Sequence, residues 1–155
     1  MGLSKGDKEV YNRALKHKSI DQKDNNERME FLGDSIINSV VSTEIFKRNP
    51  EEKEGVLSIK RAKIVSRKHL NKLGKEMGLQ TRIKSSFKFI PEKIYGNTLE
   101  AIVGAVYIDK GYEAAKRFVV SNILESKHVA TRDFIAVSYT HLRAHETVLD
   151  LVCRL

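Results

Sequence analysis

The segment from Glu27 to Lys47 constrains the fold most, because its apolar residues cover more than one stripe of the helix that it predicts. A surface helix of a globular protein carries one apolar stripe, and a wider apolar face must be covered by neighbouring elements. We therefore expect this helix to be largely surrounded and to end at Asn49-Pro50. Its apolar positions are Met29, Phe31, Leu32, Ile36, Ile37, Val40, Val41, Ile45 and Phe46.

The remaining apolar spacing predicts an all-α domain. Asn25 and Asn26 are expected to cap the Glu27 helix, and residues from Gln80 to Ile94 indicate an irregular connection around Pro91. Five or six helices without a convincing strand indicate the all-α class. Further helices are expected over Lys5 to His17, Glu54 to Met77 with any break near Gly74, Asn97 to Asp109, and Tyr112 to Ser126.

The composition fits one soluble globular domain with a basic surface. The 155 residues include 28 Lys and Arg against 20 Asp and Glu, a net charge of +8, which is typical of a chain with a polyanionic partner. Scattered solvated lysines explain such a balance equally well. No apolar run of membrane-spanning length, signal peptide or zinc-ligand cluster occurs, and Cys153 is the single cysteine. We expect a cytoplasmic protein without a membrane partner.

Two carboxylates inside the long predicted helix indicate a cation site. Glu30 and Asp34 are four residues apart, so their Cβ atoms lie about 6 Å apart on one face, and Glu27 lies one turn earlier. Like charges at this spacing repel, and the repulsion costs more where apolar neighbours bury them. Arg28 projects about 100° from Glu27 and about 160° from Glu30 around the axis. A divalent cation is therefore the better compensation.

A second pair of oxygen ligands occurs at Asn97 and Glu100, which are three residues apart near a predicted helix start. Taken alone, this pair is better explained as a capping box, in which Asn caps the helix and Glu completes the pattern. Together with Glu30 and Asp34, however, it forms a set of hard oxygen ligands without His or Cys. Such ligands suit Mg²⁺ or Mn²⁺, the metals of phosphoryl-transfer enzymes.

The run Asn25-Asn26-Glu27-Arg28-Met29-Glu30-Phe31-Leu32-Gly33-Asp34 resembles the signature of the ribonuclease III family, with Met29 where Leu is usual. The run from Gly96 to Gly111 resembles the second acidic motif of that family, and the resemblance covers about residues 5 to 130. It implies the helical endonuclease-domain fold of ribonuclease III and a homodimer.

The resemblance also implies roles for individual residues. Glu30, Asp34 and Glu100 occupy the catalytic and metal-ligand positions, and Asn97 is a fourth metal ligand where Asp is commonest. Since the amide keeps a ligating oxygen, we expect altered metal affinity rather than abolished catalysis. Glu27 and Glu54 fall at accessory acidic positions.

The resemblance further implies that Phe31 contacts a second subunit, although its periodicity alone favours a place in the core. Double-stranded RNA is the implied partner, read by shape through phosphates and 2′-hydroxyls, with no protein cofactor. The basic residues expected to contact it are Lys60, Arg61, Lys63, Arg67, Lys68 and Lys72 on the third helix, and Lys84, Lys88 and Lys93 after it.

The predicted function is therefore Mg²⁺-dependent cleavage of double-stranded RNA to 5′-phosphate and 3′-hydroxyl ends, in ribosomal or messenger RNA processing. The alternative is a catalytically impaired member that binds double-stranded RNA, which only Asn97 supports. A compact Mini-III enzyme is less compatible with the signature. No C-terminal RNA-binding domain is recognisable, so we expect weak, salt-sensitive RNA binding.

The domain is assigned to residues 1–136. Residues 137–155 carry no pattern continuous with it, and the run from Ser138 to Thr147 resembles translated sequencing-adapter read-through. A native amphipathic tail is the other explanation.

Overall fold

The computed structural model describes residues 5–126, so the predicted tail and the end of the predicted domain lie outside the described residues. Among these residues there is no strand, only an isolated bridge between Lys16 and Lys84, which confirms the all-α prediction. No helix in this range is long and apolar enough to cross a membrane. The elements are α1 (Lys5–Ala14), α2 (Glu27–Arg48), α3 (Glu54–Ile64), α4 (Arg67–Glu76), a 3₁₀ turn (Leu79–Thr81), α5 (Glu92–Lys110), α6 (Tyr112–Val119) and a π-helical turn (Val120–Leu124).

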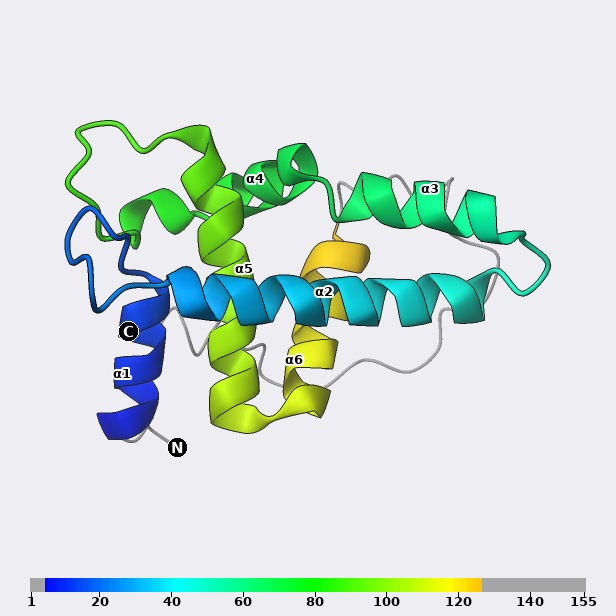
Figure 1. The fold of residues 1–155 in the computed structure, drawn as a ribbon, viewed down its shortest axis with the longest axis horizontal. Coiled ribbons are helices and arrows are strands. Elements are labelled where there is room, and N and C mark those ends of the chain that lie inside the picture. Colours follow the sequence, from blue (N-terminus) through cyan, green and yellow to red (C-terminus); the bar gives the residue numbers. More distant parts are fainter. Residues whose placement is uncertain (1–4, 127–155) are drawn as a thin grey trace.

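Helices α2 and α5 cross at the middle of the domain (Figure 1). Two glycines bring their backbones together: a Cβ atom on Gly33 would lie 1.7 Å from the carbonyl oxygen of Glu100, and one on Gly104 would lie 2.4 Å from that of Met29. Helix α2 also contacts α3 and α6, while α1 and α4 pack on α5. Most of the wide apolar face of α2 is thus covered, as its sequence predicted, but the side chains of Phe31 and Phe46 are exposed.

The predicted third helix is in fact two helices. Helix α3 ends at Ile64, and Ser66 starts α4 because its side-chain oxygen accepts a hydrogen bond from the His69 N–H at 3.3 Å. The break expected near Gly74 is wrong, since Gly74 lies inside α4 and is buried. A Cβ atom there would lie 2.6 Å from the Tyr95 carbonyl oxygen, so the glycine permits close packing on α5 rather than ending a helix.

Two helix boundaries near the site also differ from the prediction, as does one of the two expected caps. Helix α5 begins at Glu92, directly after Pro91 in the extended conformation, which places Asn97 in the second turn. Helix α1 ends at Ala14 rather than at His17, because the His17 N–H donates to the Lys84 carbonyl oxygen at 2.9 Å. At the start of α2, Asn25 receives a hydrogen bond from the Glu27 N–H at 3.0 Å, whereas the Asn26 side chain makes no capping bond.

Candidate active site

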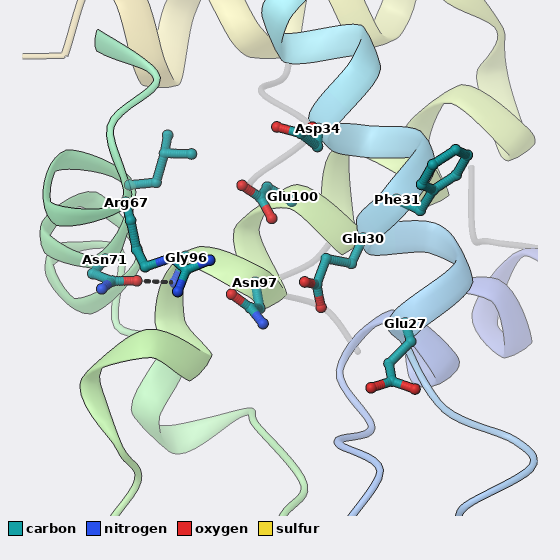
Figure 2. A pocket seen from close by; sticks show the side chains of 10 residues that line it. Glu27, Glu30, Phe31, Asp34, Arg67, Asn71, Gly96, Asn97 and Glu100 are labelled. Carbon is teal, nitrogen blue, oxygen red and sulfur yellow. Dashed lines mark hydrogen bonds between the residues drawn. The ribbon is translucent and has the colours of Figure 1, made fainter. Parts of the chain in front are cut away.

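Helices α2, α4 and α5 enclose a pocket of about 400 Å³ beside the crossing of α2 and α5. Figure 2 shows the acidic side chains of α2 and α5 on one side of this pocket and the residues of α4 on the other. The structure therefore brings Glu30, Asp34, Asn97 and Glu100 together, although the two pairs are far apart in the sequence. The lining residues are Glu27, Glu30, Phe31 and Asp34 from α2, Arg67, Leu70 and Asn71 from α4, and Gly96, Asn97 and Glu100 from α5.

Two carboxyl groups of the pocket, those of Glu30 and Glu100, have raised pKa values. Burial, with the nearby charges of Asp34 and Glu30, raises the pKa of Glu100 from 4.5 to about 7. Burial and the charge of Glu27 raise the pKa of Glu30, while a side-chain hydrogen bond from Asn97 acts in the opposite direction. The pocket therefore holds more negative charge than its protein surroundings neutralise.

Two cations lie beside these carboxylates. Lys18 binds Glu27, with 2.6 Å between Nζ and Oε1, so a lysine rather than a bound cation compensates that acid. Arg67 is the only Lys or Arg among the residues that line the pocket, and its charge lowers the pKa of both Glu30 and Glu100. Within residues 5–126, Arg67 forms no ion pair with a carboxylate. Its guanidinium therefore remains available to a ligand in the pocket.

The position of Asn97 excludes the capping-box explanation. Asn97 is the sixth residue of α5, so neither it nor Glu100 lies at a helix start, where a capping box forms. Both side chains instead lie at the pocket and are half-buried.

The donor set fits a hard cation such as Mg²⁺, because every oxygen donor is a carboxylate or an amide and the carboxylates repel one another. Within the described residues, no three His, Cys, Asp or Glu side chains approach closely enough to enclose an ion by themselves. Mg²⁺ usually keeps several waters and takes further ligands from substrate phosphates, so a partial protein ligand set is compatible with it.

Other predicted residues lie away from the pocket. Glu54 begins α3, where its carboxylate accepts a hydrogen bond from the Ser58 hydroxyl at 2.8 Å, and it does not line the pocket. Lys60 contacts Asn49 and Glu52, so its charge is partly engaged, and Arg61 and Lys63 lie on the same helix. Of the nine basic residues expected to contact RNA, only Arg67 lines the pocket.

Phe31 is 78% exposed, so the core assignment that its periodicity favoured is wrong. In Figure 2 the ring lies on the side of α2 away from Glu100 and Asn97. Its exposure at the edge of the pocket is compatible with a contact to a second subunit.

The sequence analysis missed three lining residues, Leu70, Asn71 and Gly96. The sequence does indicate one of them, because Asn71 is a polar residue next to Leu70 on the face of α4 that also buries Leu73. A polar residue on the apolar face of a short helix needs a hydrogen-bond partner.

Comparison with known proteins gives the family. The sequence profile described as ribonuclease-III-like matches residues 7–127, most of the chain. The chain belongs to the ribonuclease-III-like family. A similar solved structure is the nuclease domain of ribonuclease III from Campylobacter jejuni, with a TM-score of 0.75 and 33% sequence identity. The match covers 81% of this chain and 92% of that domain.

Curated relatives named Ribonuclease 3 are longer than this ribonuclease-III-like chain. The protein from Zunongwangia profunda is 40% identical over 92% of this chain and 62% of its own length. That from Azobacteroides pseudotrichonymphae is 43% identical over 74% of this chain and 47% of its own length. The chain thus spans about half the length of the curated relatives that it matches.

Proposed function

We propose that this chain is the catalytic part of an endoribonuclease that uses Mg²⁺, or Mn²⁺, to cut double-stranded RNA. The observation that carries the proposal is the pocket that Glu30, Asp34, Asn97 and Glu100 line together, in which the pKa values of Glu30 and Glu100 are raised. Oxygen ligands with excess negative charge bind hard cations, and hard cations serve phosphodiester hydrolysis. The family supports the same reaction.

In this proposal the carboxylates of Glu30, Asp34 and Glu100, with the Asn97 amide, hold the cation from two helices. A bound divalent cation supplies an activated water and neutralises phosphate oxygens. Arg67 faces the acids from α4, and its planar guanidinium suits a phosphate oxygen pair. Water adds to the phosphorus and the 3′ oxygen leaves, which yields 5′-phosphate and 3′-hydroxyl ends.

The RNA duplex is proposed to lie over the pocket and the basic helices beside it. Lys60, Arg61 and Lys63 on α3 are close in sequence to Arg67 and supply positive charge without base-specific geometry, as shape-based recognition requires. The exposed ring of Phe31 is proposed to contact a second copy, so that two pockets act on the two strands. We place the activity in cytoplasmic processing of ribosomal or messenger RNA.

A catalytically impaired RNA-binding protein is the second candidate, and Asn97 is the observation that favours it. An amide removes one charge from the ligand set and forms a hydrogen bond with Glu30. The three remaining acids favour the enzyme, because a protein that only binds RNA gains nothing from clustered carboxylates that repel one another, two of which, Glu30 and Glu100, are half-buried.

The test is cleavage of an end-labelled RNA duplex in Mg²⁺ and in EDTA. Glu100→Gln and Glu30→Gln should each abolish cleavage and leave circular dichroism and oligomeric state unchanged. Glu113→Gln is the control, since Glu113 is an exposed acid on α6 away from the pocket. Full cleavage by either pocket variant refutes the site. Metal-independent RNA binding without product from the unaltered chain identifies the second candidate.

A further inference from the structure

We propose that Asn71 is a positioning residue for the candidate metal site, an inference that rests on the proposed function. Asn71 lies on α4 and is only 6% exposed. Its Oδ1 atom accepts a hydrogen bond from the backbone N–H of Gly96 at 3.0 Å, in the buried interior (Figure 2). Gly96 directly precedes Asn97, so this bond acts on the part of α5 that carries the oxygen ligands.

The packing around this bond leaves no room for another arrangement. A Cβ atom on Gly96 would lie 2.5 Å from Asn71 Oδ1 and 3.2 Å from the Asn71 backbone nitrogen. One turn later on α4, a Cβ atom on Gly74 would lie 2.6 Å from the Tyr95 carbonyl oxygen. Gly96 on α5 and Gly74 on α4 thus let the backbones of the two helices come into contact next to the hydrogen bond.

The two ligand-bearing helices, α2 and α5, contact each other at the glycine crossing, where Gly33 packs against the backbone of Glu100. Asn71 fixes the same helix one turn earlier, on the opposite side of the pocket. A helix held at two successive turns can neither rotate nor slide. Asn97 and Glu100 therefore keep their orientation toward Glu30 and Asp34 even where the carboxylates repel one another.

Removing the acceptor atom, Oδ1 of Asn71, should weaken Mg²⁺ binding by more than the loss of stability explains. Partners that orient metal ligands without touching the metal typically contribute about 10- to 100-fold to metal affinity. For Asn71→Ala we expect the Mg²⁺ concentration that gives half-maximal cleavage to rise about tenfold, and the Mg²⁺-induced increase in melting temperature to shrink. Asn71→Asp keeps an oxygen acceptor at the same place and adds a negative charge beside the acids, so its half-maximal Mg²⁺ concentration should not rise above that of the unaltered chain.

Leu73→Ala is the matched control, because Leu73 is 2% exposed on the same helix but does not line the pocket. It should lower the melting temperature without changing the half-maximal Mg²⁺ concentration. All assays are run well below the lowest melting temperature. If Asn71→Ala does not fold, Asn71→Ser replaces it, since its hydroxyl is too short to reach Gly96 but keeps a polar group there.

The outcomes separate this inference from the function on which it rests. An Asn71 variant that melts earlier but needs the same Mg²⁺ concentration as the unaltered chain overturns the positioning role and leaves the nuclease intact. A tenfold higher Mg²⁺ requirement for the alanine variant, rescued by Asp, supports it. Absence of both Mg²⁺ effects in the unaltered chain overturns the proposed function, and the inference with it.

Discussion

The substitution Gly33→Ala probes the crossing of α2 and α5 directly. The added methyl group would lie 1.7 Å from the Glu100 carbonyl oxygen, 2.6 Å from the Glu100 carbonyl carbon and 3.0 Å from the Gly104 nitrogen. These are backbone atoms inside a helix, so they cannot move away individually. Reaching an ordinary contact of about 3.4 Å requires α2 and α5 to separate locally by more than 1 Å, at the residue that carries a candidate ligand.

Two opposing effects set the change in the free energy of unfolding. Alanine is favoured over glycine inside a helix by about 1 kcal/mol. Overpacking a rigid contact usually costs about 1–3 kcal/mol, and this overlap with backbone lies at the upper end. We expect Gly33→Ala to lower the free energy of unfolding by about 2 kcal/mol. A displacement of Glu100 by about 1 Å should also lower kcat about 100-fold in the fraction that remains folded.

Gly55→Ala is the matched control, because Gly55 lies in the first turn of α3 with nothing within 4 Å of an added Cβ atom. It should raise the free energy of unfolding by about 0.5 kcal/mol and leave cleavage unchanged. Urea denaturation and duplex cleavage in Mg²⁺ measure both variants. If Gly33→Ala is as stable and as active as Gly55→Ala, the close helix crossing does not exist in solution.

Three further predictions concern the pocket. In EDTA, the raised pKa of Glu100 means that the folded chain binds a proton more tightly than the unfolded chain, so stability should fall as pH rises from about 4.5 to 7. The full shift corresponds to about 3 kcal/mol, and solvent screening reduces it to about 1–2 kcal/mol. Glu100→Gln should recover this stability at pH 8 in thermal melts; an unaltered chain that melts at the same temperature at about pH 4.5 and about pH 8 contradicts this. Asn97→Asp places another negative charge beside Glu30, so it should lower stability in EDTA and enlarge the Mg²⁺-induced rise in melting temperature. An unchanged rise in melting temperature with Mg²⁺ argues against Asn97 as a ligand. Arg67→Ala should lower kcat at least tenfold at saturating RNA, whereas Lys75→Ala, which changes an exposed lysine of the same helix outside the pocket, should change it less than twofold. Equal effects would make Arg67 an ordinary surface cation.

Periodicity predicted the helices that are long and strongly patterned, but not the breaks set by single contacts. The apolar pattern of α2 extends over about five turns, and this helix begins at Glu27 as predicted. The break at Ser66 depends on a cap bond, and its polar signal is no stronger than that of other serines in the chain. Gly74 was taken for a helix break because the sequence does not show that Tyr95 packs against it.

The spacing of the acids within each helix predicted which ligands share a face, and the family resemblance predicted that the two pairs meet. Only the structure places Arg67 at the pocket, because the break before it turns α4 away from the direction of α3. The lysine partner of Glu27 was missed for a similar reason, since Lys18 lies in an irregular segment whose path no periodicity describes. Asn71 required knowledge of its partner, a backbone N–H that any residue except proline supplies.

The two candidate ligand pairs lie far apart in the sequence, and this separation determines when the pocket can form during synthesis. Glu30 and Glu100 are 70 residues apart, and no local segment contains both halves of the pocket. Closing a loop of that length costs entropy that is recovered only when α5 packs onto α2. During synthesis, the acids of α2 therefore emerge before those of α5, and if the proposed function holds, the growing chain cannot cleave RNA until α5 has emerged and docked.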